Sequence, residues 1–366
     1  MTFFKKNLLL LFSVILLAVL IPQLSSSQPM SNYELEQEVK ILKEKIEGTG
    51  IPGGLSFSGA LEIEGSIENG YGDEKTSDIT LATVELGVEA EVCDWAVGNV
   101  VLLWEEDDTE QVEVDEGTIT LGSPERSPFY LTVGKFAVPF GNYETNMISD
   151  PLTLEIGETP QSAVQMGLEH PSGFIGSVYA FNGDIDEDGE EDKINCFGAN
   201  VGYGLEAGDI GLALGAGWIN NIADSDGLGG WIDDSGFTLK DHVGGFTGHV
   251  IMTLAPFMVI GEYVAAMDDI EFINNPPQEA PSAYNIEIDY AFELMEKEAT
   301  LGVAYQGTDK CGGILPETRL LASIGVGFGE NVGVALEYAH DEDYDVSHSG
   351  TGDEADNVTI QLALEF

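Results

Sequence analysis

The sequence predicts an all-β fold, a closed antiparallel transmembrane β-barrel of about 16 strands that follows a short N-terminal coiled-coil helix. Three observations predict it. The chain begins with a secretory pattern, it has no later apolar stretch long enough for a transmembrane helix, and apolar and polar residues alternate from residue 55 to the C-terminus. Only helices and closed barrels satisfy all backbone hydrogen bonds in hydrocarbon, so an exported membrane chain of this kind must be a barrel.

Residues 1–27 have the pattern of a signal peptide. Lys5 and Lys6 precede an apolar run over 8–21, and Pro22 and small residues ending at Ser27 follow it. The run is short for a spanning helix, which disfavours a retained anchor. Together with a barrel, a cleaved signal predicts the outer membrane of a Gram-negative bacterium, with outer-membrane lipid around the strands.

Residues 28–54 predict a periplasmic coiled-coil helix and a linker. Leu35, Val39, Leu42 and Ile46 recur at heptad spacing, and a glycine-rich stretch over 48–54 then ends the helix. Two heptads are too short to hold a coiled coil alone. The segment is therefore either a helix that reinforces an oligomer, most naturally a homotrimer, or a free helical tail.

The barrel is predicted over 55–366. Within 284–290, for example, large apolar residues alternate with Asn285, Glu287 and Asp289. The strands of a β-sandwich would also alternate between apolar and polar residues. Here, however, the polar face often carries charged residues or glycine, as a water-filled lumen needs, and the segments are long enough for tilted membrane strands. The predicted strands lie at 55–68, 78–92, 95–105, 109–121, 129–137, 161–169, 173–182, 193–204, 208–219, 241–254, 257–268, 282–292, 297–307, 317–328, 331–340 and 356–366.

The connections alternate between short and long, as the periplasmic turns and outer loops of such barrels do. Short links follow 92, 169, 254 and 328, whereas long ones cover 138–160, 183–192, 220–240, 269–281 and 341–355. An even strand count places both ends of the barrel on the periplasmic side. The last strand ends at Phe366, and a terminal aromatic on an amphipathic strand resembles the signal by which such proteins reach the barrel assembly machinery.

The charge excludes nucleic acid as a partner. The chain carries 65 acidic and 13 basic residues, a formal net charge of −52. Such a field repels phosphates and concentrates cations, whether the carboxylates lie on the outer surface or in a lumen. Cys93, Cys196 and Cys311 are odd in number and widely spaced, which argues against a disulfide framework or a metal cluster.

The connection after the fifth strand carries a distinctive run of residues. Its parts are Gly134, Lys135, Pro139, Phe140, Gly141, Asp150, Pro151, Gly157 and Glu158, followed by the Phe-Asn-Gly-Asp sequence at 181–184. This run resembles the LbtU-type siderophore porin family. The resemblance implies a porin-like outer-membrane protein associated with uptake of iron chelates. The structural alternative is a loop in which Pro139 ends the strand and Gly141 allows the turn.

In general porins the loop after the fifth strand folds into the lumen, and residues 138–160 occupy that place here. The loop carries Glu144, Asp150, Glu155 and Glu158, which would attract cations and exclude anions at a constriction. If the loop stays outside the lumen, these carboxylates act only at the mouth of the barrel. Other acidic residues on the predicted lumen face are Glu62, Glu64, Glu85, Glu89, Glu262, Glu287, Asp289 and Glu337, with Arg319 and His249 among few opposing groups.

These features predict passive diffusion of small solutes, with a preference for cations. Residues 28–54 leave no room for the plug domain of an energised receptor. An acidic corridor would disfavour anionic ferric chelates, so a neutral or cationic solute, or a metal cation, fits the charge better. The iron chelate remains an implication of the resemblance, and passage of sugars along aromatic residues is an open variant.

One outer loop has the D-x-D-x-D-G spacing of calcium-binding loops. Its acidic residues are Asp184, Asp186, Asp188, Glu190 and Asp192. An EF-hand would have Glu at the twelfth position, where this chain has Asn195. The loop therefore either binds Ca²⁺ or is a solvated acidic loop, and no cofactor is otherwise required.

Two other classes of function compete with the porin. An enzyme has support only from His340, Asp341 and His348 in the last outer loop, and no nucleophile is marked, so we expect no catalysis. A non-conducting barrel that anchors an envelope-spanning helix is the other alternative. The glycine-rich inner faces near 211–215 and 325–327 leave room in the lumen and argue against it.

Overall fold

The computed structural model describes residues 54–366, apart from 74, 107, 108, 110, 123–126, 186, 190–192 and 330. The predicted signal peptide at 1–27 and nearly all of the predicted helix and linker at 28–54 lie outside the described residues. None of the helices in the described part of the chain is long and apolar enough to span a membrane.

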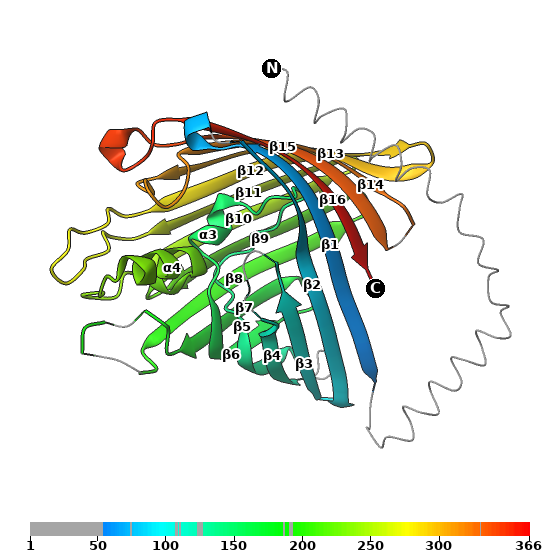
Figure 1. Cartoon of the computed structure of the whole chain (residues 1–366). Coiled ribbons are helices and arrows are strands. Elements are labelled where there is room, and N and C mark those ends of the chain that lie inside the picture. The colour runs from blue at the N-terminus through cyan, green and yellow to red at the C-terminus, as the bar shows by residue number, and fades with distance from the viewer. Residues whose placement is uncertain are drawn as a thin grey trace, which may run out of the picture.

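The chain forms a closed barrel of sixteen antiparallel strands, which confirms the predicted fold class (Figure 1). The strands are β1 (Leu55–Asn69), β2 (Lys75–Cys93), β3 (Ala96–Trp104), β4 (Glu113–Gly122), β5 (Phe129–Ala137), β6 (Pro160–Glu169), β7 (Phe174–Phe181), β8 (Cys196–Ala207), β9 (Ile210–Ile219), β10 (Gly245–Leu254), β11 (Phe257–Ala266), β12 (Ser282–Leu294), β13 (Lys297–Asp309), β14 (Thr318–Gly327), β15 (Val332–Glu342) and β16 (Glu354–Glu365). Each strand pairs with its sequence neighbour, and β16 pairs with β1 to close the barrel. Closure leaves no strand edge without hydrogen-bond partners, which a bilayer requires.

The fourth strand shows how an apparent interruption fits into the sheet. Val101 of β3 lies opposite Glu116, whereas the next residue, Leu102, lies opposite Val114. Asp115 is therefore the extra residue of a β-bulge, and β4 continues through the acidic interruption that its sequence contains.

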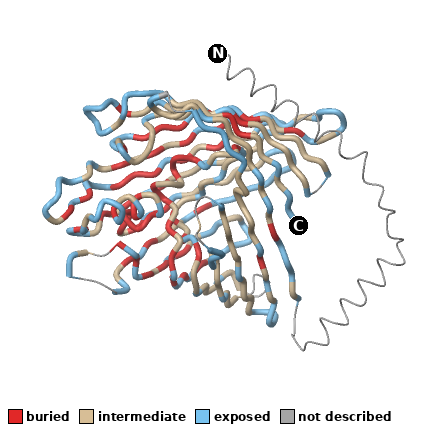
Figure 2. The backbone as a smooth tube through the Cα atoms, in the orientation of Figure 1, coloured by how far each residue is buried: buried red, intermediate tan, exposed pale blue. Residues whose placement is uncertain are grey.

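The two faces of the strands have opposite character. Large apolar side chains such as Ile286, Ile288 and Val303 are about half exposed on the outer face, as expected of side chains that contact lipid. The intervening Glu287 points into the barrel and is fully buried there. Figure 2 shows buried positions gathered where segments inside the barrel meet its wall.

The long connections pack on one another instead of forming separate loops. In the described residues the connections between strands contain five short helices: η2 (Tyr71–Asp73), α3 (Leu152–Glu155), η3 (Ile222–Asp224), α4 (Asp226–Ser235) and η4 (Val346–His348). One buried hydrophobic cluster includes Leu152 of α3 and the adjacent Ile156, Leu228 and Ile232 of α4, and Phe272 from the loop after β11. The loops after β5, β9 and β11 therefore share one core at one end of the barrel.

Candidate functional site

Residues 138–159, here called the inner loop, run inside the barrel from β5 to β6. Figure 1 shows the α3 helix of this loop within the ring of strands. The loop reaches β11, β12 and β15 on the far side of the barrel, where its amides and hydroxyls bind three glutamates. These contacts place the acidic side chains of the loop inside the lumen.

Each of the three wall glutamates accepts two backbone amides or an amide and a hydroxyl from the inner loop. Glu262 of β11 accepts the amides of Asn142 and Tyr143 at 2.8 and 2.9 Å. Glu287 of β12 accepts the Thr145 hydroxyl at 2.6 Å and the Asn146 amide at 2.7 Å. Hydrogen bonds to a charged acceptor are stronger than neutral ones, so this set fixes the loop firmly.

The third glutamate holds the tip of the inner loop. Glu337 of β15 accepts the amides of Ile148 and Ser149 at 2.6 and 3.1 Å, and the Ser149 hydroxyl at 2.6 Å. Gln306 of β13 adds a neutral contact, because its side-chain oxygen accepts the Leu152 amide at 3.0 Å. We call Glu262, Glu287 and Glu337 the anchor glutamates.

The structure therefore corrects the expected role of part of the acidic lumen face. We expected Glu262, Glu287, Asp289 and Glu337 to extend the field of the corridor. All four are instead buried against the inner loop, and Asp289 accepts the Asn146 side-chain amide at 3.1 Å. Each of the four accepts at least one hydrogen bond from the loop, so these residues mainly position the loop.

The glycines of the family-like run also have a different role from the one expected. Gly141 does not take a left-handed conformation; a Cβ at Gly141 or at Gly157 would instead clash with the ring or hydroxyl of Tyr143. Tyr143 itself has a φ of 57°. The two glycines thus leave space for this side chain, which packs against two separate parts of the inner loop.

A second group of carboxylates remains available to the lumen. Glu62 and Glu64 of β1, and Glu85 and Glu89 of β2, lie on the face opposite to the exposed apolar residues of these strands. Glu62 accepts the Thr83 hydroxyl at 2.9 Å, and the Gln361 amide donates to Glu64 at 2.9 Å. Asp150 of the inner loop is close enough to Glu64 for electrostatic repulsion.

The acidic residues of the inner loop differ in exposure. Glu144 and Asp150 are exposed, whereas Glu155 and Glu158 are half-buried. Burial, followed by repulsion from Asp226 and Asp150 and then from Asp115 and Glu155, raises the pKa of Glu158 to about 7. Carboxylates of the inner loop, of β4 and of α4 thus repel one another electrostatically inside the barrel.

Basic groups do little to offset this charge. The Arg319 guanidinium on β14 binds Asp341 through two hydrogen bonds of 2.9 Å, so this predicted opposing charge is already paired. The Lys135 amine donates to the Val114 carbonyl at 3.0 Å. Across the described parts of β1–β4, Lys75 at the start of β2 is the only basic residue.

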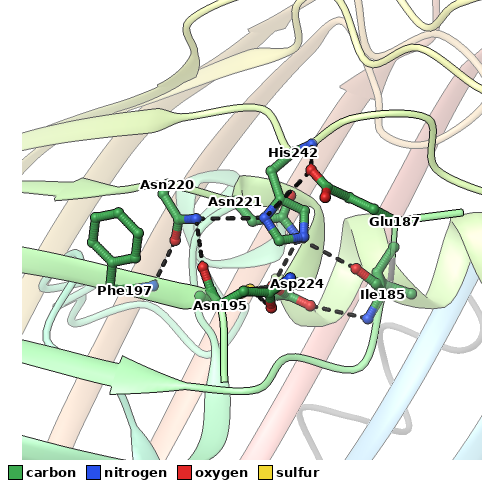
Figure 3. Close-up of polar contacts among 9 residues, drawn as sticks. Ile185, Glu187, Asn195, Phe197, Asn220, Asn221, Asp224 and His242 are labelled. Atoms are coloured by element: carbon green, nitrogen blue, oxygen red, sulfur yellow. Dashed lines mark hydrogen bonds and ion pairs between the residues drawn. The ribbon is translucent and has the colours of Figure 1, made fainter. Parts of the chain in front are cut away.

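Asp224 is a functional-site neighbour that the sequence did not mark. Its buried carboxylate accepts the Ile185 amide at 3.0 Å and the Asn221 side-chain amide at 2.8 Å (Figure 3). It also accepts the Asp184 amide at 3.0 Å and the Cys196 thiol at 3.1 Å. Burial raises the pKa of this carboxyl despite these donors. Its partners come from three separate segments, so the contact joins the loops after β7 and β9.

This network involves part of the predicted calcium loop. The Asp184 carboxylate accepts the Gln161 amide at 2.6 Å, and Glu187 accepts the His242 amide at 2.7 Å. Asp188 is exposed. The other three predicted ligands, Asp186, Glu190 and Asp192, lie outside the described residues, so calcium binding stays a prediction.

We expect Asp224→Ala to loosen the outer loops. The substitution leaves the Asp184 and Ile185 amides without their acceptor, at a cost of about 1–3 kcal/mol for each buried group. Amide hydrogen exchange in 182–185 and 220–243 should accelerate, while exchange in β12 and β13 stays unchanged. Asp233→Asn, an exposed carboxylate on α4, is the matched control. Equal protection in both variants would contradict the assigned role.

Comparison with known proteins places the chain among porin-like barrels. No family model matches it. It is 27% identical to a UPF0422 protein of Coxiella burnetii over 334 residues, covering 87% of this chain and 70% of that protein. It is 25% identical to UPF0422 protein lpl2888 of Legionella pneumophila, covering 85% of this chain but only 66% of that relative. The chain thus spans about two thirds of the length of these relatives.

Solved structures with the same fold are outer-membrane porins and channels. The anion-selective porin from Comamonas acidovorans superposes with a TM-score of 0.60 at 9% identity, covering 86% of this chain and 99% of that one. The channel DcaP of Acinetobacter baumannii gives 0.58 at 13% identity, covering 85% and 97%. OmpF of Salmonella typhi, in complex with daunomycin, gives 0.59 at 10% identity, covering 87% and 99%. At these identities the likeness establishes the fold.

Proposed function

We propose that this protein is a passive, plug-free channel of the outer membrane that admits small solutes and prefers cations to anions. One observation carries the proposal. The inner loop bears Asp150, Glu155 and Glu158, and the β1–β2 wall bears further lumen-facing carboxylates, with Lys75 as the only basic residue in the described parts of β1–β4. A narrow passage lined by one sign of charge concentrates ions of the opposite sign.

The charge of the lumen, and not the fold, supports the choice of cations. The porin of Comamonas acidovorans shares the fold and is described as anion-selective, so the barrel alone permits either preference. Here Arg319 is paired with Asp341. The free charge near the inner loop is therefore negative.

A planar bilayer under a salt gradient tests the proposal directly. We expect an open channel whose reversal potential shows cations permeating several-fold faster than anions. An anion-selective channel would contradict the placement of the carboxylates. A folded, inserted protein without conductance would instead support a barrel that only anchors other parts of the envelope.

Cation preference should fall as the pH falls from 8 to 6. Glu158 has a pKa raised to about 7, so it is mostly ionised at pH 8 and mostly neutral at pH 6. Protonation removes one negative charge from the inner loop. The measurement is the reversal potential at both pH values, and Glu158→Gln is the control because it should lose most of this pH dependence. A wild-type reversal potential that does not change over this range would argue against the role of Glu158.

The resemblance to siderophore porins supports iron chelates as one class of solute, with a restriction on charge. An acidic corridor should admit neutral or cationic chelates faster than anionic ones. Liposomes containing the purified protein, assayed with iron chelates of matched size and different charge, would separate these cases. We also propose a homotrimer in outer-membrane lipid, inserted by the barrel assembly machinery through its Phe366 end.

A further inference from the structure

Four ionisable side chains form a compact group where β15 and β16 approach the last outer loop. In the strand register, His340 lies directly opposite Asp356, and Glu342 lies directly opposite Glu354. One nitrogen of His340 and one carboxylate oxygen of each glutamate lie within 4.8 Å of one another. Neither the inner loop nor the anchor glutamates contribute to this group.

The group lies on the outer surface of the barrel. Glu337 points into the lumen, where it binds the inner loop. Because side chains alternate along a strand, Tyr338, His340 and Glu342 lie on the opposite face. Tyr338 is 40% exposed there, and its hydroxyl donates to Asp356 at 2.6 Å.

His340 is oriented as a metal-binding imidazole would be. Its Nδ1 lies 2.9 Å from an Asp356 carboxylate oxygen. An ionised carboxylate can only accept, so Nδ1 carries the proton, and in the neutral imidazole the lone pair of Nε2 is left free. A carboxylate that fixes the ring and tautomer of a histidine in this way commonly accompanies metal-ligating histidines.

The two glutamates are placed unfavourably unless a cation joins them. Like charges directly opposite each other on neighbouring strands destabilise a sheet. In the described residues, no Lys or Arg forms an ion pair with Glu342 or Glu354, and the Thr318 hydroxyl reaches Glu342 only at 3.4 Å. A divalent cation between them would offset this repulsion.

We propose that His340, Glu342 and Glu354 bind a divalent transition-metal ion of the zinc class on the outer surface of the barrel. Imidazole nitrogen and carboxylate oxygen are both ligands of such ions, and solvent can complete the coordination. The imidazole distinguishes the site from the all-oxygen sites that Ca²⁺ and Mg²⁺ prefer. The ion would link β15 to β16, next to the β16–β1 pair that closes the barrel.

The test is equilibrium binding of Zn²⁺ to the purified full chain in detergent at pH 7.5. Wild type should bind Zn²⁺ saturably, and His340→Gln and Glu354→Gln should each weaken binding by at least about tenfold. Asp356→Asn, which removes the charge that orients the His340 ring but no proposed ligand, should weaken it by about 10–100-fold. His348→Gln is the matched control, because this exposed histidine lies in η4 outside the group.

Further readouts make the result decisive. Far-ultraviolet circular dichroism should show the same strand content in all variants, and Zn²⁺ should raise the unfolding temperature of wild type and of His348→Gln only. Three results would overturn the proposal: no saturable binding by wild type, unchanged affinity in folded His340→Gln, or displacement of Zn²⁺ by equimolar Ca²⁺.

Discussion

Glu287→Ala is expected to enlarge the passage through the barrel and to make its conductance noisier. Glu287 is fully buried and accepts two short hydrogen bonds from Thr145 and Asn146 of the inner loop. A hydrogen bond to a charged group contributes about 1.5–3 kcal/mol, so losing one such bond raises the detached population of this part of the loop about tenfold or more. Glu287→Gln should have a smaller effect, because its amide oxygen still accepts.

Two measurements check this expectation. Single-channel recording should show higher mean conductance with more frequent transitions, and liposome swelling should show entry of larger neutral sugars. Glu89→Ala is the control, because Glu89 is an exposed carboxylate on the lumen face of β2. If folded Glu287→Ala keeps the wild-type conductance and size limit, the inner loop does not depend on this anchor.

Neutralising the inner loop should produce the largest change in selectivity. At about 5–10 Å from a permeating ion in water, one unit charge contributes about 0.4–0.8 kcal/mol, which raises the permeability of a cation about two- to fourfold and lowers that of an anion by the same factor. The double variant Asp150→Asn and Glu158→Gln removes two such charges. The ratio of cation to anion permeability should therefore fall by at least about sixteenfold at pH 8, where Glu158 of the wild type is mostly ionised.

The reversal potential under a salt gradient measures this ratio. Asp268→Asn, an exposed carboxylate in the loop after β11, should leave it nearly unchanged. Because neither neutralised residue provides an anchor for the loop, the size limit for neutral sugars should stay the same. A selectivity that is equal in the double variant and in Asp268→Asn would show that the decisive charges lie elsewhere.

The barrel could be predicted from sequence because its signal is local. Alternation fixes which residues face lipid, and it identified Ile286, Glu287 and Ile288 correctly without knowledge of their neighbours. The fourth strand forms although acidic residues and a glycine interrupt its alternation, because a β-bulge at Asp115 restores the register with β3.

The roles of the lumen residues could not be predicted in the same way. Alternation placed Glu262 and Glu337 on the inner face, but their partners are backbone amides more than 100 residues away. Backbone donors have no sequence signature. Asp224 was missed for a similar reason, because its partners Asp184 and Ile185 belong to a different loop. The acidic inner loop could be anticipated only from its place after the fifth strand.

The anchor glutamates hold the inner loop mainly through its backbone. The position of the loop is therefore independent of the side chains that set ion selectivity. Five of their contacts use main-chain amides, those of residues 142, 143, 146, 148 and 149. Every amino acid except proline supplies such a donor. The barrel wall can therefore hold the backbone of this loop in place whatever side chains the loop carries. Mutation, or evolution, can replace the charged side chains of the loop while the same three glutamates keep its backbone in position.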